Sequence, residues 1–263
     1  MAQFRKAYVL LSGGLDSTTC LYIAMDQAES VEAISVNYGQ RHKKEMEYAA
    51  ASCKQFGLVH TILDVGALLR GDSVMLTDDS RGKVDVPNIS YSAIKGVSPT
   101  YVPFRNGLML SAITAHAQKW VNQEIESLTK HYASHGLGSV PPKESAVHDM
   151  RDSTAIYFGA HADDAANFAY PDCDDRFTGA MANAISIGSY YTIKLMVPLQ
   201  WMTKGEIVEK GAALRVDFSK TWSCYKGLDL HCGTCPTCIS RREAFTAAGV
   251  LDPTEYADVV FRS

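Results

Sequence analysis

The chain has 263 residues, of which 46% are hydrophobic and 21% are charged, and its net charge at pH 7 is −4. This composition is typical of a globular protein with one large or two small domains, and it excludes a disordered tail or a fibre. The small acidic charge argues against a protein that coats nucleic acid.

The start of the chain predicts a cytoplasmic protein. Its charged first residues are followed by an apolar run, Ala7–Leu11, that is shorter than the roughly 7–15 residues of a signal-peptide core. No segment of the sequence approaches the roughly 20 apolar residues that span a bilayer. Four of the seven cysteines lie within 224–238, which is typical of metal binding in a reducing compartment. We therefore expect no membrane partner.

Short apolar runs alternate with helical patterns in the first part of the chain. Strands are predicted over Ala7–Leu11, 31–36 and 60–65, and helices over 17–27 and 43–56. Continuous apolar runs are typical of parallel strands that are buried on both faces, and the alternation implies right-handed crossovers. The sequence therefore predicts an α/β fold with a Rossmann-like, doubly wound parallel sheet.

The alternation of apolar runs and helical patterns weakens over residues 69–100, where Gly, Pro, Asp and Ser predict a surface excursion or an active-site lid. A helix is predicted over 106–123, and we interpret the polar, His-rich segment at about 120–154, with Gly136 and Gly138, as an insertion. Two further strands and three further helices are then predicted, over 155–160 and 194–197, and over 177–187, 204–214 and 240–248. We expect an α/β domain over 1–215 and a cysteine-rich subdomain over 216–263.

A glycine-rich motif separates the first predicted strand from the first predicted helix, and it reads Leu11-Ser12-Gly13-Gly14-Leu15-Asp16-Ser17. Two glycines let the backbone approach a ligand closely, and the N–H groups of the turn and the helix N-terminus then face one anion. The hydroxyls of Ser12 and Ser17 add donors. The carboxylate of Asp16 would repel phosphate unless a divalent cation lay between them, which implies Mg²⁺. The motif is similar to the S-G-G-x-D-S pyrophosphate loop of N-type ATP pyrophosphatases, and it matches neither the Walker pattern nor the dinucleotide fingerprint.

Four cysteines follow the spacing C-x7-C-x2-C-x2-C: Cys224, Cys232, Cys235 and Cys238. Two-residue gaps let thiolates converge on one tetrahedral ion, and four such ligands predict a closed, structural zinc site. A [4Fe–4S] cluster also takes four cysteines and is the main alternative. Zinc is favoured because ATP chemistry needs no electron transfer.

Six motifs, taken in order, resemble the 7-cyano-7-deazaguanine synthase family from Ala7 to about Ala257, with about 120–154 unmatched. They are the glycine-rich loop extended to Thr19, Asn37-Tyr38-Gly39-Gln40-Arg41-His42, Tyr101-Val102-Pro103-Phe104-Arg105-Asn106, Tyr170-Pro171-Asp172-Cys173, Thr221-Trp222-Ser223-Cys224-Tyr225 and the run from His231 to Cys238.

The resemblance implies an adenine nucleotide alpha hydrolase-like fold with a small C-terminal zinc-binding subdomain. It also implies that ATP activates 7-carboxy-7-deazaguanine for attack by ammonia, through adenylated carboxylate and amide intermediates, to give a nitrile. ATP, Mg²⁺ and Zn²⁺ are the implied cofactors, and the family tends to form homodimers. Because no glutaminase segment is visible, free ammonia is the expected nitrogen source.

The resemblance also assigns site residues. The ATP loop runs over Leu11, Ser12, Gly13, Gly14, Leu15, Asp16, Ser17, Thr18, Thr19, Cys20 and Leu21. Arg105 is a candidate clamp on phosphate or carboxylate, because its planar guanidinium suits both, and a structural ion pair is the alternative. Lys204 is a candidate for neutralising phosphate charge, and a solvated lysine at a helix start is the alternative. Asp16 and Ser17 complete the expected catalytic set.

On the substrate side, Tyr170 and Asp172 are expected to border the deazaguanine pocket, with an aromatic wall and an acceptor for the purine-like N–H edge. Asp163 or Asp164 is expected to face the same edge or Mg²⁺, and helix capping is the alternative for both. Cys173 is interpreted as a buried, inert thiol. No catalytic role is assigned to His42, His116 or His161.

The sequence departs from the family pattern at Asp174, where an arginine is usual, and in the insertion. Two alternatives stay open. One, which both departures support, is a ligase that keeps the adenylation step but transfers the acyl group to another amine, for example on a protein in antiphage defence. The other is an RNA-binding or RNA-modifying zinc module, against which the absence of a basic, aromatic stripe argues.

Overall fold

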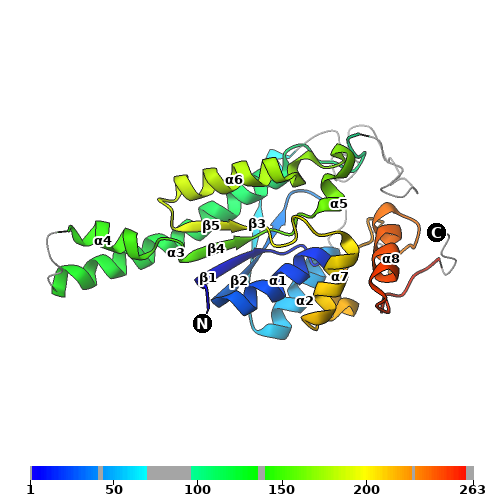
Figure 1. The fold of residues 1–263 in the computed structure, drawn as a ribbon, viewed down its shortest axis with the longest axis horizontal. Helices are drawn as coiled ribbons and strands as arrows, with labels where there is room; N and C mark the ends of the chain where they lie inside the picture. Colours follow the sequence, from blue (N-terminus) through cyan, green and yellow to red (C-terminus); the bar gives the residue numbers. More distant parts are fainter. Residues whose placement is uncertain (1, 41–43, 70–95, 136–139, 227–228, 259–263) are drawn as a thin grey trace.

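The computed structural model describes residues 2–40, 44–69, 96–135, 140–226 and 229–258 (Figure 1). Several predicted features lie outside these residues: Arg41 and His42 of the second motif, the first residue of the helix predicted over 43–56, most of the excursion at 69–100, and Gly136 and Gly138 of the insertion.

Five parallel strands form one sheet in the order β3-β2-β1-β4-β5. They are β1 (Phe4–Leu10), β2 (Ala28–Asn37), β3 (Val59–Asp64), β4 (Thr154–Tyr157) and β5 (Ile193–Met196). Val9 of the central strand pairs with Ala33 on one side and Tyr157 on the other. The predicted α/β fold with a parallel sheet is confirmed.

The helices of the described residues are α1 (Leu15–Gln27), α2 (Lys44–Phe56), α3 (Arg105–His135), α4 (Pro142–Asp149), α5 (Ala162–Ala165), α6 (Asp175–Gly188), α7 (Lys204–Ala213) and α8 (Pro236–Ala248). Alternation along β1 divides the core between the two faces of the sheet. Ala7 and Val9 pack in the cluster that contains α1, α2 and α7, whereas Tyr8 and Leu10 pack in the cluster that contains α3 and α6. The sheet is thus doubly wound, as predicted (Figure 1).

The neighbouring strands β1 and β4 form the switch point of this topology. The chain leaves β1 into α1, on one face of the sheet, and leaves β4 toward α6, on the other face. The carboxyl ends of two such strands open a crevice in which α/β proteins bind ligands. The glycine-rich loop follows β1 and the Gly159–Asp164 segment follows β4, so both reach this crevice.

The predicted end of a helix at Gln123 is wrong, because α3 continues to His135. Val121 is the last buried residue of this helix, and past it α3 extends beyond the sheet, where α4 packs along it (Figure 1). A helix that no longer faces the core keeps only a weak apolar stripe, which explains why the polar sequence there did not indicate helix. None of the described helices is long and apolar enough to cross a membrane.

The C-terminal segment packs on the α/β core. Helix α8 lies against α7, and its residues Ala244 and Phe245 join the same buried cluster as α1. Arg241 is fully buried and binds Thr221 Oγ1 at 2.8 Å, the Phe218 carbonyl at 3.0 Å and Asp252 at 3.2 Å. This guanidinium therefore connects α8 to the segment that precedes it in the chain, at 218–221, and to the segment that follows it, at Asp252.

A polar cluster centred on Glu32 joins α3 to three strands. Its carboxylate accepts hydrogen bonds from Thr61 of β3 (2.9 Å) and bonds to His116 of α3 (2.8 Å), and it pairs with Lys6 of β1 (3.1 Å). Burial alone would raise the pKa of Glu32, but the hydrogen bonds from His116 and Lys6 lower it below its usual value.

We expect Glu32→Gln to lower the free energy of unfolding by about 1–3 kcal/mol at pH 7, because Lys6 and His116 lose their anion. Because the folded-state pKa of Glu32 is lowered, its stabilising effect is complete above the unfolded pKa, near 4.3, and is lost as the pH falls through the folded value. Urea titrations at several pH values measure this. A difference between wild type and variant that persists fully in strong acid would contradict the ionic role.

Candidate active site

A cavity of about 230 Å³ lies at the carboxyl ends of β1, β2 and β4. The glycine-rich loop forms its floor, and the first turns of α2, α3 and α7 contribute Glu45, Arg105 and Lys204 to its wall. The segment after β4 adds Phe158–Ala160, and a C-terminal segment adds Trp222–Tyr225. Three helix starts and three loop segments thus converge on the crevice expected from the sheet topology.

The glycine-rich loop is held by hydrogen bonds between its own serines. The hydroxyls of Ser12 and Ser17 are 3.0 Å apart, and Ser12 Oγ accepts the Gly14 N–H at 3.2 Å. Gly14 is the N-cap of α1 and provides no side-chain cap, so the first N–H groups of the helix have no helical acceptor. Leu15, Asp16 and Ser17 line the cavity, and their N–H groups suit an anion.

Gly13 lets α2 lie directly against the loop. Its φ is +88°, and a Cβ on it would lie 2.1 Å from the Glu45 carbonyl oxygen and 2.7 Å from the Ala49 nitrogen. Its carbonyl accepts the Trp222 N–H at 2.9 Å. This glycine therefore sets the positions of both α2 and the C-terminal wall relative to the loop.

Asp16 belongs to a cluster of four ionisable groups. Its Oδ2 lies 3.3 Å from Lys204 Nζ and 3.6 Å from His161 Nε2, and His161 Nε2 lies 3.2 Å from Asp164 Oδ2. Two carboxylates, a lysine and a histidine therefore meet at the switch point. Asp16 Oδ1 is buried and has no hydrogen-bond partner among the described residues, so it is available to a ligand.

The cluster keeps Asp16 ionised. Burial alone would raise the pKa of Asp16, but the charges of Lys204 and His161 lower it well below its usual range. Burial would likewise lower the pKa of Lys204 and of His161, but the carboxylates of Asp16 and Asp164 raise both. An ionised carboxylate beside anion-binding N–H groups is the arrangement that suits Mg²⁺ between phosphate and protein.

Arg105 lies on the other side of the cavity. Its Nη1 donates to the Tyr38 hydroxyl at 3.4 Å, and the guanidinium lies over the Tyr38 ring at 5.4 Å. Its Nε is buried and has no hydrogen-bond partner in the described part of the chain. A planar donor with an unused N–H in a cavity fits a carboxylate or a phosphate.

Other predicted residues support the cavity without lining it. The Tyr170 hydroxyl bonds to Thr100 Oγ1 at 2.5 Å, and Asp172 Oδ2 accepts the Asn106 N–H at 3.0 Å, which places this carboxylate at the start of α3. Asp163 Oδ2 accepts the Lys204 N–H at 2.7 Å, whereas Asp164 lines the cavity. The last residues of the predicted ATP loop are buried in α1: Thr18, Thr19, Cys20 and Leu21.

Cys173 and Asp174 lie at the edge of this region. Cys173 lines the cavity, and burial raises the pKa of its thiol well above the usual value, so the thiol stays protonated. Asp174 is the N-cap of α6 and accepts the Arg176 N–H at 2.9 Å. The carboxylate that stands in place of the family's usual arginine thus has a local structural role.

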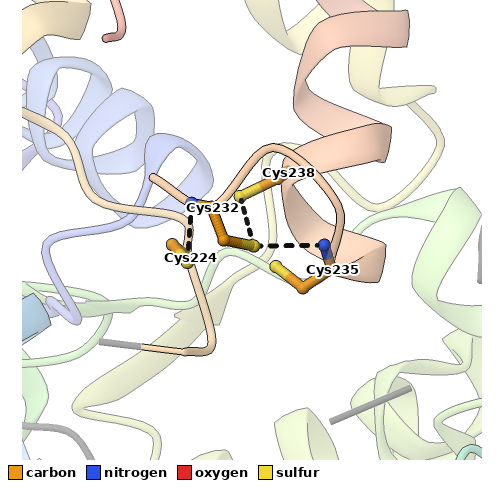
Figure 2. Close-up of side chains that lie close together, drawn as sticks. All are labelled: Cys224, Cys232, Cys235 and Cys238. Atoms are coloured by element: carbon orange, nitrogen blue, oxygen red, sulfur yellow. Dashed lines mark hydrogen bonds between the residues drawn. The ribbon is translucent and has the colours of Figure 1, made fainter. Parts of the chain in front are cut away.

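The four cysteines meet at one point (Figure 2). All are buried, and their sulfur atoms lie within 4.8 Å of one another. The Cys224 sulfur accepts the Cys232 N–H at 3.4 Å, and the Cys232 sulfur accepts the Cys235 N–H at 3.2 Å. Four closely spaced sulfurs that accept N–H donors fit a tetrahedral zinc ion, whose Zn–S distance is about 2.3 Å.

The cysteine cluster shares a wall with the cavity. Cys224 and Thr237 line the cavity, as do Trp222, Ser223 and Tyr225. Trp222 is buried between the rings of Tyr48 and His231, at centroid distances of 5.4 and 4.1 Å. A metal held by these cysteines would therefore order one side of the candidate active site.

Sequence reasoning missed the contributions of Tyr38, Glu45 and Trp222 to the cavity. Tyr38 and Trp222 belong to the second and fifth motifs of the family resemblance, and this membership is a signal that the sequence contains. Glu45 stands three residues after the motif that ends at His42, in a stretch that looks like an ordinary helix start.

A family model and the most similar named relatives point to the same family. The model of the family described as queuosine biosynthesis protein QueC matches residues 6–132 and 145–249, so its gap is shorter than the predicted insertion. A 7-cyano-7-deazaguanine synthase of Brucella ovis is 38% identical over 97% of this chain and 95% of the relative. One of Paracoccus denitrificans is 36% identical over the same shares. Among solved structures, the U34-tRNA thiolase NcsA from Methanococcus maripaludis with its [4Fe-4S] cluster is similar over 92% of this chain and 64% of that chain, with 15% identity and a TM-score of 0.39.

Gly13→Ala is expected to lower the free energy of unfolding by about 2–5 kcal/mol, because the new methyl group meets the backbone of α2 and the left-handed conformation is strained. Gly57→Ala is a matched control, since Gly57 also has a positive φ, +63°, but has open space around it. The control should cost only about 1–2 kcal/mol. Equal losses in guanidinium titrations would refute the close-packing argument.

Cys235→Ser is expected to abolish metal binding and to lower the thermal midpoint by roughly 10 °C, because zinc binding contributes folding free energy. Plasma mass spectrometry should find one zinc per wild-type chain, whereas iron would identify the cluster alternative. Cys53→Ala, outside the set, should retain the metal. A stable, metal-free Cys235→Ser protein with an unchanged midpoint would contradict the structural role.

Proposed function

Because the chain belongs to the queuosine biosynthesis protein QueC family, we propose that it converts 7-carboxy-7-deazaguanine and ammonia to 7-cyano-7-deazaguanine at the expense of ATP. One observation carries the proposal: an anion-binding loop, a carboxylate–lysine pair and an arginine with an unused N–H line the same cavity. A homodimer in the cytoplasm, as implied by the family resemblance, is part of the proposal.

The reaction needs two activations. A carboxylate oxygen of the substrate attacks the α-phosphorus of ATP, and pyrophosphate leaves. Ammonia then attacks the acyl carbon and AMP leaves, which gives the amide. The amide oxygen attacks a second ATP in the same way, and loss of AMP and of the nitrogen-bound protons gives the nitrile. Each step develops negative charge on phosphate oxygens, which positioned N–H donors and cations stabilise.

The glycine-rich loop and Lys204 are assigned to the phosphates. The loop and the first turn of α1 offer N–H groups to the β- and γ-phosphates, and the Lys204 ammonium, half-buried beside Asp16, offsets charge on the α-phosphate. Asp16 is ionised, and its Oδ1 has no hydrogen-bond partner in the described part of the chain, so it is assigned as the ligand of Mg²⁺, which supplies positive charge to the phosphates when bound.

Arg105 is assigned to the carboxylate of the deazaguanine. Its buried Nε has no hydrogen-bond partner among the residues that the structure describes, and Tyr38 beneath the guanidinium restricts its movement. Met109 and Phe158 line the cavity and provide apolar surface for a purine-like ring. Asp172 and Asp163 act through positioning, since they hold α3 and α7 where Arg105 and Lys204 begin, and Tyr170 holds Thr100 in the segment that leads to α3.

A single assay tests the proposal. The protein is incubated with 7-carboxy-7-deazaguanine, Mg-ATP and an ammonium salt, and AMP, pyrophosphate, amide and nitrile are measured by mass spectrometry. Formation of nitrile with AMP supports the proposal. AMP with an acyl group on another amine, and without nitrile, would assign the chain to the ligase alternative. No substrate-dependent AMP would overturn the adenylation chemistry.

Lys204→Ala is expected to lower kcat for AMP formation about 10²–10³-fold, because the α-phosphate loses its positioned cation. Lys210→Ala, an exposed lysine of the same helix, serves as the control and should leave kcat within about twofold. Circular dichroism would establish that both variants are folded. Full activity in Lys204→Ala would refute its assigned role.

A further inference from the structure

Glu45 lines the cavity and has no part in the mechanism described above. It lies in the first turn of α2, which the close approach at Gly13 holds against the glycine-rich loop. No described residue donates a hydrogen bond to its carboxylate. A carboxylate that lines the cavity and has no hydrogen-bond donor among the described residues is available to a bound substrate.

Glu45 shares the cavity with the three charged residues assigned to the proposed substrates. They are Arg105, Asp16 and Lys204, from α3, α1 and α7, and their charges act on the Glu45 carboxyl. Arg105 is assigned to the carboxylate of the substrate, and the other two to the phosphates. Glu45 thus lines the cavity in which these two groups are joined, and the bond between them, from acyl carbon to phosphate oxygen, is the one that the amine breaks.

The protonation of Glu45 is matched to neutral pH. Burial and the charge of Asp16 raise its pKa to about 7, against the opposing effect of Arg105 and of Lys204. A base works best when its pKa is near the working pH. The proton that such a base would remove is one of ammonium. In neutral water ammonia is almost entirely ammonium, which has no lone pair with which to attack a carbonyl.

We propose, on the premise of the proposed function, that Glu45 is the general base that converts bound ammonium to ammonia beside the acyl adenylate. The Glu45 carboxylate takes one proton from ammonium. The freed nitrogen lone pair forms the bond to the acyl carbon, and the carbon–oxygen bond to AMP breaks with its electron pair going to AMP. The nitrogen then loses its second proton to solvent, which leaves the neutral amide.

The test compares two nucleophiles in wild type and Glu45→Gln. Ammonium requires a base, whereas hydroxylamine carries a lone pair at neutral pH and traps an acyl adenylate as the hydroxamate. At pH 7 the variant should lose at least about 10²-fold in amide and nitrile formation with ammonium. Its hydroxamate formation should stay within about twofold of wild type. Glu47→Gln, an exposed glutamate of the same helix, is the control and should change neither rate.

The pH dependence adds an independent readout. The wild-type rate with ammonium should rise as the pH passes through about 7 and then level off, because Glu45 accepts a proton only when it is ionised. The variant depends on free ammonia, so its rate should keep rising about tenfold per pH unit. Glu45→Asp, which keeps a carboxylate, should recover at least about tenfold of the activity that Glu45→Gln loses.

Three outcomes would overturn the inference: equal loss with both nucleophiles, no loss with ammonium, or no recovery in Glu45→Asp together with an unchanged pH profile. Equal loss would make Glu45 a structural or adenylation residue. Wild-type protein that forms neither AMP nor hydroxamate would overturn the proposed function itself, which is a different result from a defect confined to Glu45→Gln.

Discussion

The burial of an ionised Asp16 is the constraint on which the cavity depends. The side chain of Asp16 is half-buried and its Oδ1 is fully buried, so an isolated carboxylate there would be destabilised, and Lys204 and His161 offset that effect. The three residues come from α1, from the start of α7 and from the segment after β4. Their ion pairs form because β1 and β4 are neighbours in the sheet, which brings α1, the start of α7 and the segment after β4 together. The charge arrangement of the cavity therefore depends on the topology of the fold.

The cavity also depends on its C-terminal wall, which residues 222–225 and Thr237 form. Trp222 donates its N–H to Gly13, and Arg241 holds the strand-like segment that carries Trp222 to α8. The cysteines fix the same segment at Cys224 and the start of α8 at Cys235 and Cys238. A structural metal would thus act on catalysis through geometry alone, since it would restrain the wall without contacting the reacting groups.

Much of the architecture could be predicted from local sequence because parallel strands buried on both faces leave unbroken apolar runs, such as Ala7–Leu11. The cysteine cluster could be predicted because its ligands are close in sequence. The far end of α3 could not, because it leaves the core and its apolar stripe weakens after Val121. Nor could the sequence separate Asp163 from Asp164, since one caps α7 and the other faces the cavity only in the folded chain. The place of Glu45 in the cavity could not be predicted either, because Arg105 and Lys204, which line the cavity with it, lie far from it in the sequence.

The glycine-rich loop near residue 13 and the wall at 222–237 lie on the same cavity although about two hundred residues separate them in the sequence. During translation the residues of the parallel sheet, whose last strand ends at Met196, are made before the wall, and N-terminal regions generally fold first. The cavity gains this wall only after Cys238 has left the ribosome. A nascent chain that ends before residue 222 is therefore expected to hold the strands of the sheet but to lack one side of the cavity.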